Sequence, residues 1–268
     1  MNVRARVCPQ TGLYLVPARG GDGWRIAKEQ YVRSGGILSV PENKRVGPLP
    51  DDAPDRRGRF DTIGRTVYFG QTQAATYAEV LQDFRRHRLA LEADAEAAGF
   101  DVDEYVEAIS SQAGANNVDR PWAIGGQWQL DRCLHKVAMP SEGWWVRAND
   151  KATINQVSMD LSPRLRELGV GLLTLADLEG ESRAVTTLVA QYIREQNLFD
   201  GSRPLGIEFP SKTGYGTCWA WWNRRADDGL TPDANDPKTV LDLNVDVPAF
   251  RRVANDWELD VLPGRPRY

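Results

Sequence analysis

The spacing of the hydrophobic residues changes near position 70, from one typical of a strand to one typical of a helix. The run Thr66–Gly70 is short, β-branched and aromatic and ends in glycine, so we predict a strand there. Thr72 is placed to cap a following helix, and residues 74–99 are dense in alanine, leucine, glutamate and arginine, which favour helices. The apolar positions that recur at helical spacing, and are expected to face the core, are Tyr77, Val80, Leu81 and Phe84.

The sequence becomes more polar beyond His87. We expect the helix to continue there as a solvated arm, followed by another helix near residues 101–109. The stretch from about 86 to 125 is therefore interpreted as a helical insertion rather than as a separate domain.

Strand and helix patterns are interspersed over the rest of the chain. Alternation of residue types over 133–139 predicts a strand, and Pro163 within the helical stretch 151–168 fits the first position of a second helix. A helix is also expected at 182–196, and further strands at 143–147, 171–176, 205–209, 217–222, 239–243 and 258–262. Because no regular βαβ alternation appears, the expected fold class is α+β.

Net charge and cysteine usage exclude several classes of protein. The net charge is -4, which argues against direct nucleic-acid binding, because such binding needs Lys and Arg to neutralise phosphates. Three widely spaced cysteines without a CxxC pair predict neither a disulfide framework nor a structural zinc site. No apolar run suits a signal peptide or a membrane span, so we expect a cytoplasmic protein without a membrane partner.

The chain has only two histidines, His87 and His135, and neither a GxGxxG nor a P-loop motif. A Ser-His-Asp triad and a histidine-rich metal site therefore have little to be built from, and we expect no metal. A Rossmann or P-loop nucleotide site is likewise not expected.

Two distant stretches carry a more specific pattern. The first runs over residues 58–70 and on to 75–81, with an Arg-Phe pair, a strand containing Tyr68 and a helix containing Glu79. The second runs over 206–211 and on to 216–220, with a Gly-Ile-Glu-Phe-Pro-Ser strand end and a Cys-Trp-Ala strand. Together with the connecting stretches 127–132 and 180–186, these residues resemble the RES-domain family, from about residue 55 to about residue 225.

The resemblance implies an NAD-degrading enzyme that cleaves the nicotinamide–ribose bond, with NAD as substrate and phosphate as an optional co-substrate. It also implies a fold related to ADP-ribosyltransferases, with two mostly antiparallel sheets flanked by helices. On this basis residues 56–225 form a RES-like catalytic domain with the helical insertion. Residues 1–55, rich in glycine and proline, form a loop-rich N-terminal extension, and 226–268 form a C-terminal extension packed on the same domain.

Carried onto this sequence, the resemblance places Glu79, Arg59 and Ser211 in the catalytic site and Tyr68 beside the ligand. A carboxylate stabilises the positive charge that develops on the ribose, and an arginine can bind a pyrophosphate bidentately. An aromatic ring such as that of Tyr68 can stack on nicotinamide. The roles of two further arginines are left open by the sequence. Arg57 could bind the pyrophosphate in place of Arg59, and Arg183 either lines the pocket or forms a structural ion pair.

Several members of the family are toxins held in check by a small antitoxin protein, which implies such a partner here. The long N-terminal segment and the helical insertion leave that partnership open, since the extra helix could fill the docking place or form a homodimer face. Transfer of ADP-ribose to a protein, and a non-catalytic NAD-binding module of the same fold, are the alternatives.

Overall fold

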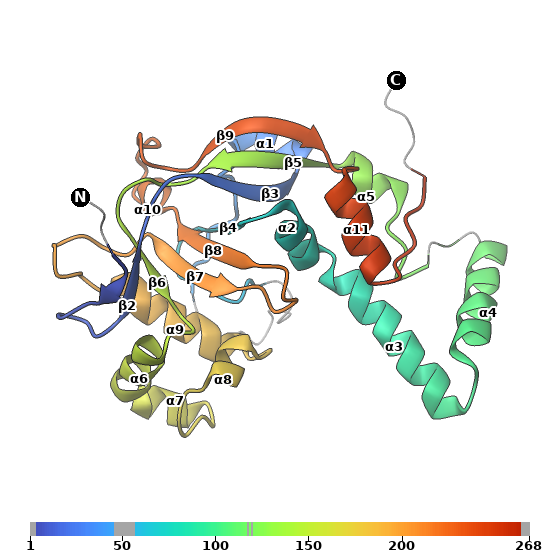
Figure 1. Cartoon of the computed structure of the whole chain (residues 1–268), viewed down its shortest axis with the longest axis horizontal. Helices are drawn as coiled ribbons and strands as arrows, with labels where there is room; N and C mark the ends of the chain where they lie inside the picture. Colours follow the sequence, from blue (N-terminus) through green and yellow to red (C-terminus); the bar gives the residue numbers. More distant parts are fainter. Residues whose placement is uncertain (1–3, 46–56, 117, 119, 264–268) are drawn as a thin grey trace.

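A computed structural model describes residues 4–45, 57–116, 118 and 120–263. Its centre is a mixed nine-stranded sheet in the order β1-β2-β6-β7-β8-β4-β3-β5-β9, with β6 and β7 parallel and all other neighbours antiparallel (Figure 1). The strands are β1 Arg6–Val7, β2 Tyr14–Pro17, β3 Asp22–Lys28, β4 Thr66–Gly70, β5 Arg132–Ala138, β6 Trp144–Arg147, β7 Gly206–Pro210, β8 Thr217–Trp222 and β9 Lys238–Asn244. The α+β class and the mostly antiparallel pairing are confirmed.

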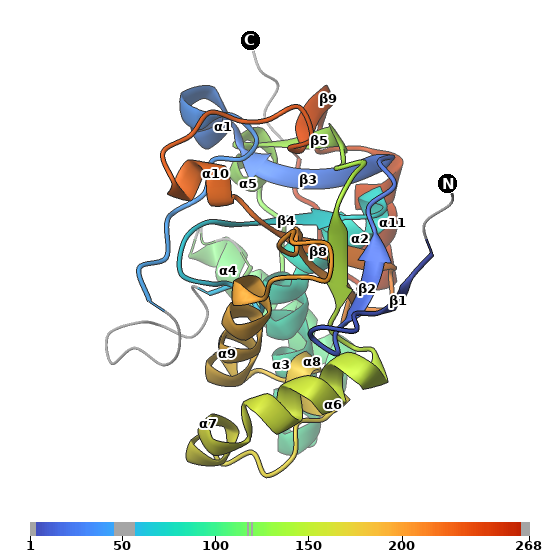
Figure 2. The same ribbon diagram turned by 90° about the vertical axis from the view of Figure 1, so that its left-hand side faces the viewer.

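The prediction of two sheets is wrong, because the described strands form one sheet. One half of it, β1-β2-β6-β7-β8-β4, is joined to the other half, β3-β5-β9, through a single pair of residues. Strand β3 pairs with β5 along its whole length, but it meets β4 only where Trp24 lies opposite Gly70. Gly70 packs so tightly that a Cβ atom there would lie 2.3 Å from the Thr76 hydroxyl oxygen. The sheet turns at this junction, so that β3 and β5 pass above β4 and β8 (Figure 2).

Helices surround the sheet, and their bounds are α1 Glu29–Gly35, α2 Gln73–Val80, α3 Gln82–Ala98, α4 Val102–Ala115, α5 Gly126–Leu130, α6 Lys151–Asp160, α7 Ser162–Glu167, α8 Leu175–Glu179, α9 Arg183–Glu195, α10 Arg224–Asp227 and α11 Pro248–Asp256. Helices α6 to α9 gather below the sheet in Figure 1, whereas α2, α5 and α11 lie near β3 and β5. No helix in the described ranges is long and apolar enough to cross a membrane.

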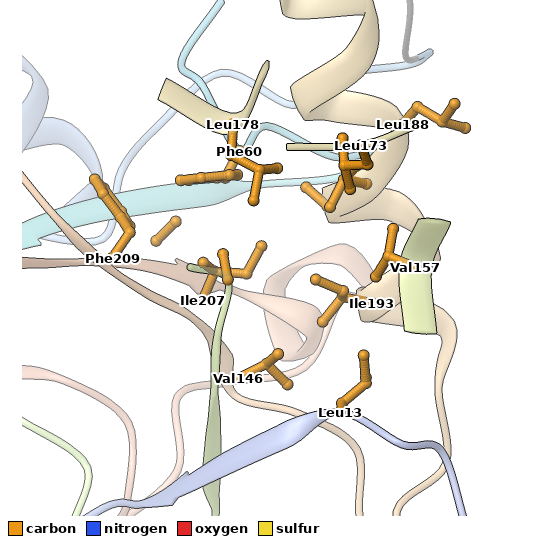
Figure 3. Close-up of a cluster of buried hydrophobic side chains, with 14 of the residues drawn as sticks. Leu13, Phe60, Val146, Val157, Leu173, Leu178, Leu188, Ile193, Ile207 and Phe209 are labelled. Carbon is orange, nitrogen blue, oxygen red and sulfur yellow. The ribbon is translucent and has the colours of Figure 1, made fainter. Parts of the chain in front are cut away.

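The first hydrophobic core lies between α9 and the strands β6 and β7. Val185, Leu188, Val189 and Ile193 recur along α9 at helical spacing, and all four are buried. Figure 3 shows Ile193 in one cluster with Val146 of β6 and Ile207 of β7. Phe60 and Phe209 lie at one end of this cluster, with ring centroids 4.9 Å apart, and they form an apolar base beneath the loop that carries Arg59.

The second core fixes α2 against α11. Tyr77 is fully buried, its ring lies 5.4 Å from that of Phe250, and its hydroxyl donates to the Val245 carbonyl at 2.6 Å. Leu81 is also fully buried, as predicted, whereas Val80 is 36% exposed because α2 ends there and α3 begins at Gln82. The predicted helix over 74–99 is therefore two helices with a break at Leu81.

Three other predictions were wrong at the level of secondary structure. The expected strand at 171–176 is absent, because Thr174 and Asp177 form a capping box that starts α8. Val261 forms only an isolated bridge with Ile124, in place of the strand expected at 258–262. Residues 4–45, expected to be loop-rich, form β1, β2, β3 and α1, and the prolines at 48, 50 and 54 lie outside the described residues.

The predicted arm consists of α3 and α4, which project from the body beside each other (Figure 1). Asp101 caps α4 through its side chain, and none of the residues of α4 is buried. Helix α3 ends at Gly99, which has a left-handed backbone conformation with a φ of 73°, and the chain turns there towards α4.

Candidate functional site

A cleft of about 350 Å³ opens where the two halves of the sheet meet. Its walls come from β3, β4, the second half of α2, the start of α3, the loop before Phe60 and the region around Phe209. Residues more than 100 positions apart are thereby brought together. The residues that line it are Arg25, Ile26, Val40, Gly58, Arg59, Thr66, Tyr68, Phe69, Gly70, Thr76, Glu79, Val80, Gln82, Asp83, Arg86, Arg183, Phe209, Lys212 and Cys218.

Four of the six residues singled out from the sequence line this cleft: Arg59, Tyr68, Glu79 and Arg183. Ser211 lies directly behind Glu79 and is 5% exposed. Arg57 does not line the cleft, and its carbonyl accepts a hydrogen bond from Arg183 Nε at 3.0 Å. Of these two arginines, Arg59 lines the cleft and Arg57 does not.

Glu79 is held in one orientation by donors from two different segments. Ser211 Oγ donates to its Oε1 at 2.6 Å, and Gln82 Nε2 donates to its Oε2 at 3.1 Å. Helix α2 presents Glu79 to the cleft because Thr72 caps the helix start and Tyr77 anchors its other face in the core. A carboxylate with both oxygens engaged in this way cannot rotate freely, so it is ready to face a charge that forms beside it.

The turn after β7 holds Ser211 in place. The Ser211 amide donates to the Gly216 carbonyl at 2.8 Å, and its hydroxyl lies 2.6 Å from Thr213 Oγ1. Gly214 and Gly216 both have positive φ angles, 78° and 131°, which only glycine adopts readily. The Pro-Ser-Lys-Thr-Gly-Tyr-Gly sequence thus builds a tight turn whose serine points at Glu79.

Arg59 is a buried cation without an acidic partner. The residue is 7% exposed, and its guanidinium lies 5.0 Å from the Phe209 ring centroid and 5.6 Å from that of Phe60. It forms neither a hydrogen bond nor an ion pair with any residue that the structure describes. Burial lowers the pKa of Arg59, and the nearby Glu79 counteracts this. A buried cation of this kind is costly unless an anion reaches it.

Tyr68 contributes its ring to the cleft, whereas its hydroxyl is used within the protein. That hydroxyl donates to Asp61 Oδ1 at 2.9 Å and accepts from the Phe60 amide at 2.9 Å. Asp61 Oδ2 accepts from the Gly58 amide at 2.9 Å, so the two side chains tie both sides of Arg59 to β4. Burial, followed by the Asp61 charge, raises the pKa of Tyr68 well above its ordinary value, so the phenol stays neutral.

We expect Tyr68→Phe to act mainly through the position of Arg59. The variant keeps the ring but leaves the Phe60 amide and one Asp61 oxygen without their partner, and the free energy of unfolding should fall by about 1–2 kcal/mol. Denaturant titration measures this loss. Anions should bind to the cleft more weakly, because the loop that holds Arg59 loosens. Weaker anion binding at unchanged stability would instead mean that the hydroxyl contacts the ligand directly.

Cys218 lies beneath the site and is not suited to be a nucleophile. Burial is the main reason that its pKa is raised well above the ordinary value, and the neighbouring Glu79 raises it further. The thiol therefore stays protonated and inert. Across the described ranges there is no group of three or more His, Cys, Asp or Glu side chains that could hold a metal ion.

The cleft has a positive charge that the acidic chain as a whole does not suggest. Among the described residues, five cationic side chains line it, against two acidic ones, Glu79 and Asp83. Three of these cations, Arg25, Arg86 and Lys212, were not among the site residues predicted from the sequence. Lys212 directly follows Ser211, which was a usable signal, whereas Arg25 was hidden because its segment was expected to be a loop.

Arg25 enters the cleft from β3. Its Nη2 donates to the Ser39 carbonyl at 3.4 Å, while its Nη1 is buried and lacks a hydrogen-bond partner in the described structure. Burial lowers its pKa to about 10, so it remains charged at neutral pH. Arg25 and Arg59 are therefore both cations that an anionic ligand would stabilise.

Comparisons with known proteins give no guidance: no family model, no curated protein and no solved structure matches this chain. A function for the cleft has to be inferred from its residues.

Proposed function

We propose that the protein binds NAD in this cleft and cleaves the bond between nicotinamide and ribose. The observation that carries the proposal is the Glu79 carboxylate, oriented by Ser211 and Gln82 in a cleft that also holds the unpaired Arg59. Glu79, Ser211 and Arg59 are among the residues on which the resemblance to the RES-domain family rests. An ADP-ribosyltransferase-related fold is part of the same proposal.

The residues suit the charge changes of this reaction. As the C1′–N bond breaks, its electron pair leaves with nicotinamide, whose ring nitrogen loses its positive charge, and positive charge builds on the ribose. A fixed carboxylate at Glu79 stabilises that charge, in the way that carboxylates act in glycoside hydrolysis. Ser211 keeps the carboxylate aimed without adding charge, and the neutral Tyr68 ring offers a stacking surface for nicotinamide.

The cationic side chains that line the cleft suit the pyrophosphate of NAD. A pyrophosphate carries two negative charges, and a guanidinium binds such oxygens through two parallel N–H donors. Arg59 is held over Phe209 and donates to none of the described residues, and Arg25 Nη1 has no hydrogen-bond partner among them. Binding of the pyrophosphate would compensate the cost of burying both cations.

The attacking group decides among three outcomes. Water attacks C1′ and loses a proton to give ADP-ribose, whereas phosphate in the same place gives ADP-ribose 1″-phosphate. A nucleophilic side chain of another protein would give an ADP-ribosylated protein. The excess of cations in the cleft favours phosphate, because it attracts anions.

Purified protein incubated with NAD tests the proposal, with free nicotinamide measured in the presence and in the absence of phosphate. We expect nicotinamide release, and a rise in rate with phosphate if phosphorolysis is the reaction. Labelled NAD added with a cell lysate separates the third outcome, since only transfer leaves label on a protein band. Folded protein that binds NAD but releases no nicotinamide in any of these conditions would leave a non-catalytic binding module.

A further inference from the structure

Three cations of the cleft converge on one carboxylate at its rim. Glu181 lies in the short link between α8 and α9, and it forms ion pairs with Lys212 Nζ at 2.8 Å, Arg86 Nη2 at 3.4 Å and Arg183 Nη2 at 3.7 Å. Lys212, Arg86 and Arg183 are here called the rim cations. All three line the cleft, whereas Glu181 itself does not.

Two of the rim cations are held by backbone groups independently of Glu181. Arg183 donates through Nε to the Arg57 carbonyl at 3.0 Å, and Lys212 donates through Nζ to the Gly180 carbonyl at 3.2 Å. Their side chains are 19% and 17% exposed. These cations would therefore stay in place if the acid left.

Glu181 is more exposed to solvent than any of the three rim cations with which it pairs. Its side chain is 69% exposed, so it leaves its position at little cost in burial. Lys212 is the main reason that its pKa is lowered, so the carboxylate is charged at neutral pH and competes with other anions. Two carboxylates serve the three rim cations, because Arg86 Nη1 also pairs with Asp83 Oδ1 at 3.6 Å. One positive charge is therefore left over at the rim.

We propose that the rim cations are a binding subsite for a phosphate group, and that Glu181 occupies this subsite when no ligand is bound. A phosphate group has three or more oxygens that can accept from several donors at once and carries more charge than the carboxylate. The group belongs either to the pyrophosphate of NAD or to inorganic phosphate, and this identification of its source rests on the proposed function. Displacement of Glu181 then sets the affinity of the cleft for anions.

The effect of Glu181 on binding has a definite sign. Glu181→Gln removes the competing charge and leaves the cations in place, so phosphate groups should bind more tightly, by about three- to tenfold, as expected for losing exposed ion pairs. Lys212→Met should have the opposite effect. If Glu181 were merely a structural brace for the rim, its substitution would weaken binding instead.

Calorimetric titration of the full chain with ADP-ribose and, separately, with inorganic phosphate tests the inference without any turnover. Tighter binding to Glu181→Gln and weaker binding to Lys212→Met support it, and the probe that responds identifies the source of the phosphate group. Glu179→Gln is the matched control, because Glu179 lies two positions before Glu181 and forms no ion pair with a cation in the described ranges. Unchanged or weaker binding of both probes to Glu181→Gln would overturn the inference.

The same titration separates this inference from the proposed function. A protein that releases no nicotinamide, yet binds either probe more tightly after Glu181→Gln, retains the phosphate subsite and loses the proposed activity. A protein that releases nicotinamide, but binds both probes equally well before and after Glu181→Gln, retains the proposed activity and overturns the phosphate subsite.

Discussion

Replacing Glu79 by glutamine is expected to lower kcat for nicotinamide release from NAD by about 10²- to 10³-fold, the usual cost of removing one preorganised group that stabilises charge in the transition state. The amide is the same size as the carboxylate and can still accept from Ser211 Oγ through its oxygen. It carries no charge, however, so the positive charge on the ribose loses its counterpart. Because that charge is absent from bound NAD, KM should change much less than kcat.

Steady-state rates of nicotinamide release measure both constants, and a thermal melt confirms that the variant is folded. Glu96→Gln on the solvent face of α3 is a suitable control, since Glu96 is exposed and lies outside the cleft. A Glu79→Gln protein with at least half of the parent rate would show that this carboxylate does not stabilise the transition state. A variant that keeps at least half of the parent kcat but has a much larger KM would assign Glu79 to ligand binding.

Replacing Arg59 by methionine is expected to raise the KM for NAD roughly 10- to 100-fold, the range that corresponds to losing a charge-assisted hydrogen-bond pair. The expected fall in kcat is smaller, because the pyrophosphate is present in both ground state and transition state. Methionine is unbranched and can fill the place of the arginine stem over Phe209.

The same variant should be no less stable than the parent protein when no ligand is bound. Arg59 is buried and forms no ion pair with any described residue, so its removal relieves a desolvation cost that the nearby Glu79 offsets only in part. Thermal unfolding with and without ADP-ribose measures this: the ligand should raise Tm of the parent protein and have little effect on the variant.

Arg57→Met is the matched comparison for Arg59→Met, because the two arginines are two positions apart and only Arg59 lines the cleft. We expect the Arg57 variant to change KM far less, since the contact that Arg57 makes with Arg183 uses its backbone carbonyl. A larger effect on KM at position 57 than at position 59 would reverse the assignment of the clamp.

Local patterns were sufficient to identify most elements near the site. The strand Thr66–Gly70, the cap at Thr72 and the helix at 182–196 follow from side-chain shape, capping chemistry and 3.6-residue spacing, and the structure contains all three. Prediction of secondary structure from these local patterns failed at two elements. The capping box of Thr174 overrode a strand-like run. The helix α11 was not predicted, although Pro248 at its start and the buried Phe250, Val253 and Ala254 at helical spacing are a usable signal.

The sequence by itself determined the kinds of residue available for chemistry: a carboxylate on a helix, a serine in a glycine-rich turn, many arginines and few histidines. Only the tertiary structure decided which of them meet. Ser211 reaches Glu79 across 132 positions because β7, β8 and β4 are neighbours in the sheet. Arg59 rather than Arg57 faces the cleft because Asp61 and Tyr68 fix the loop between them. Such choices depend on contacts between distant segments, and short-range spacing carries no information about them.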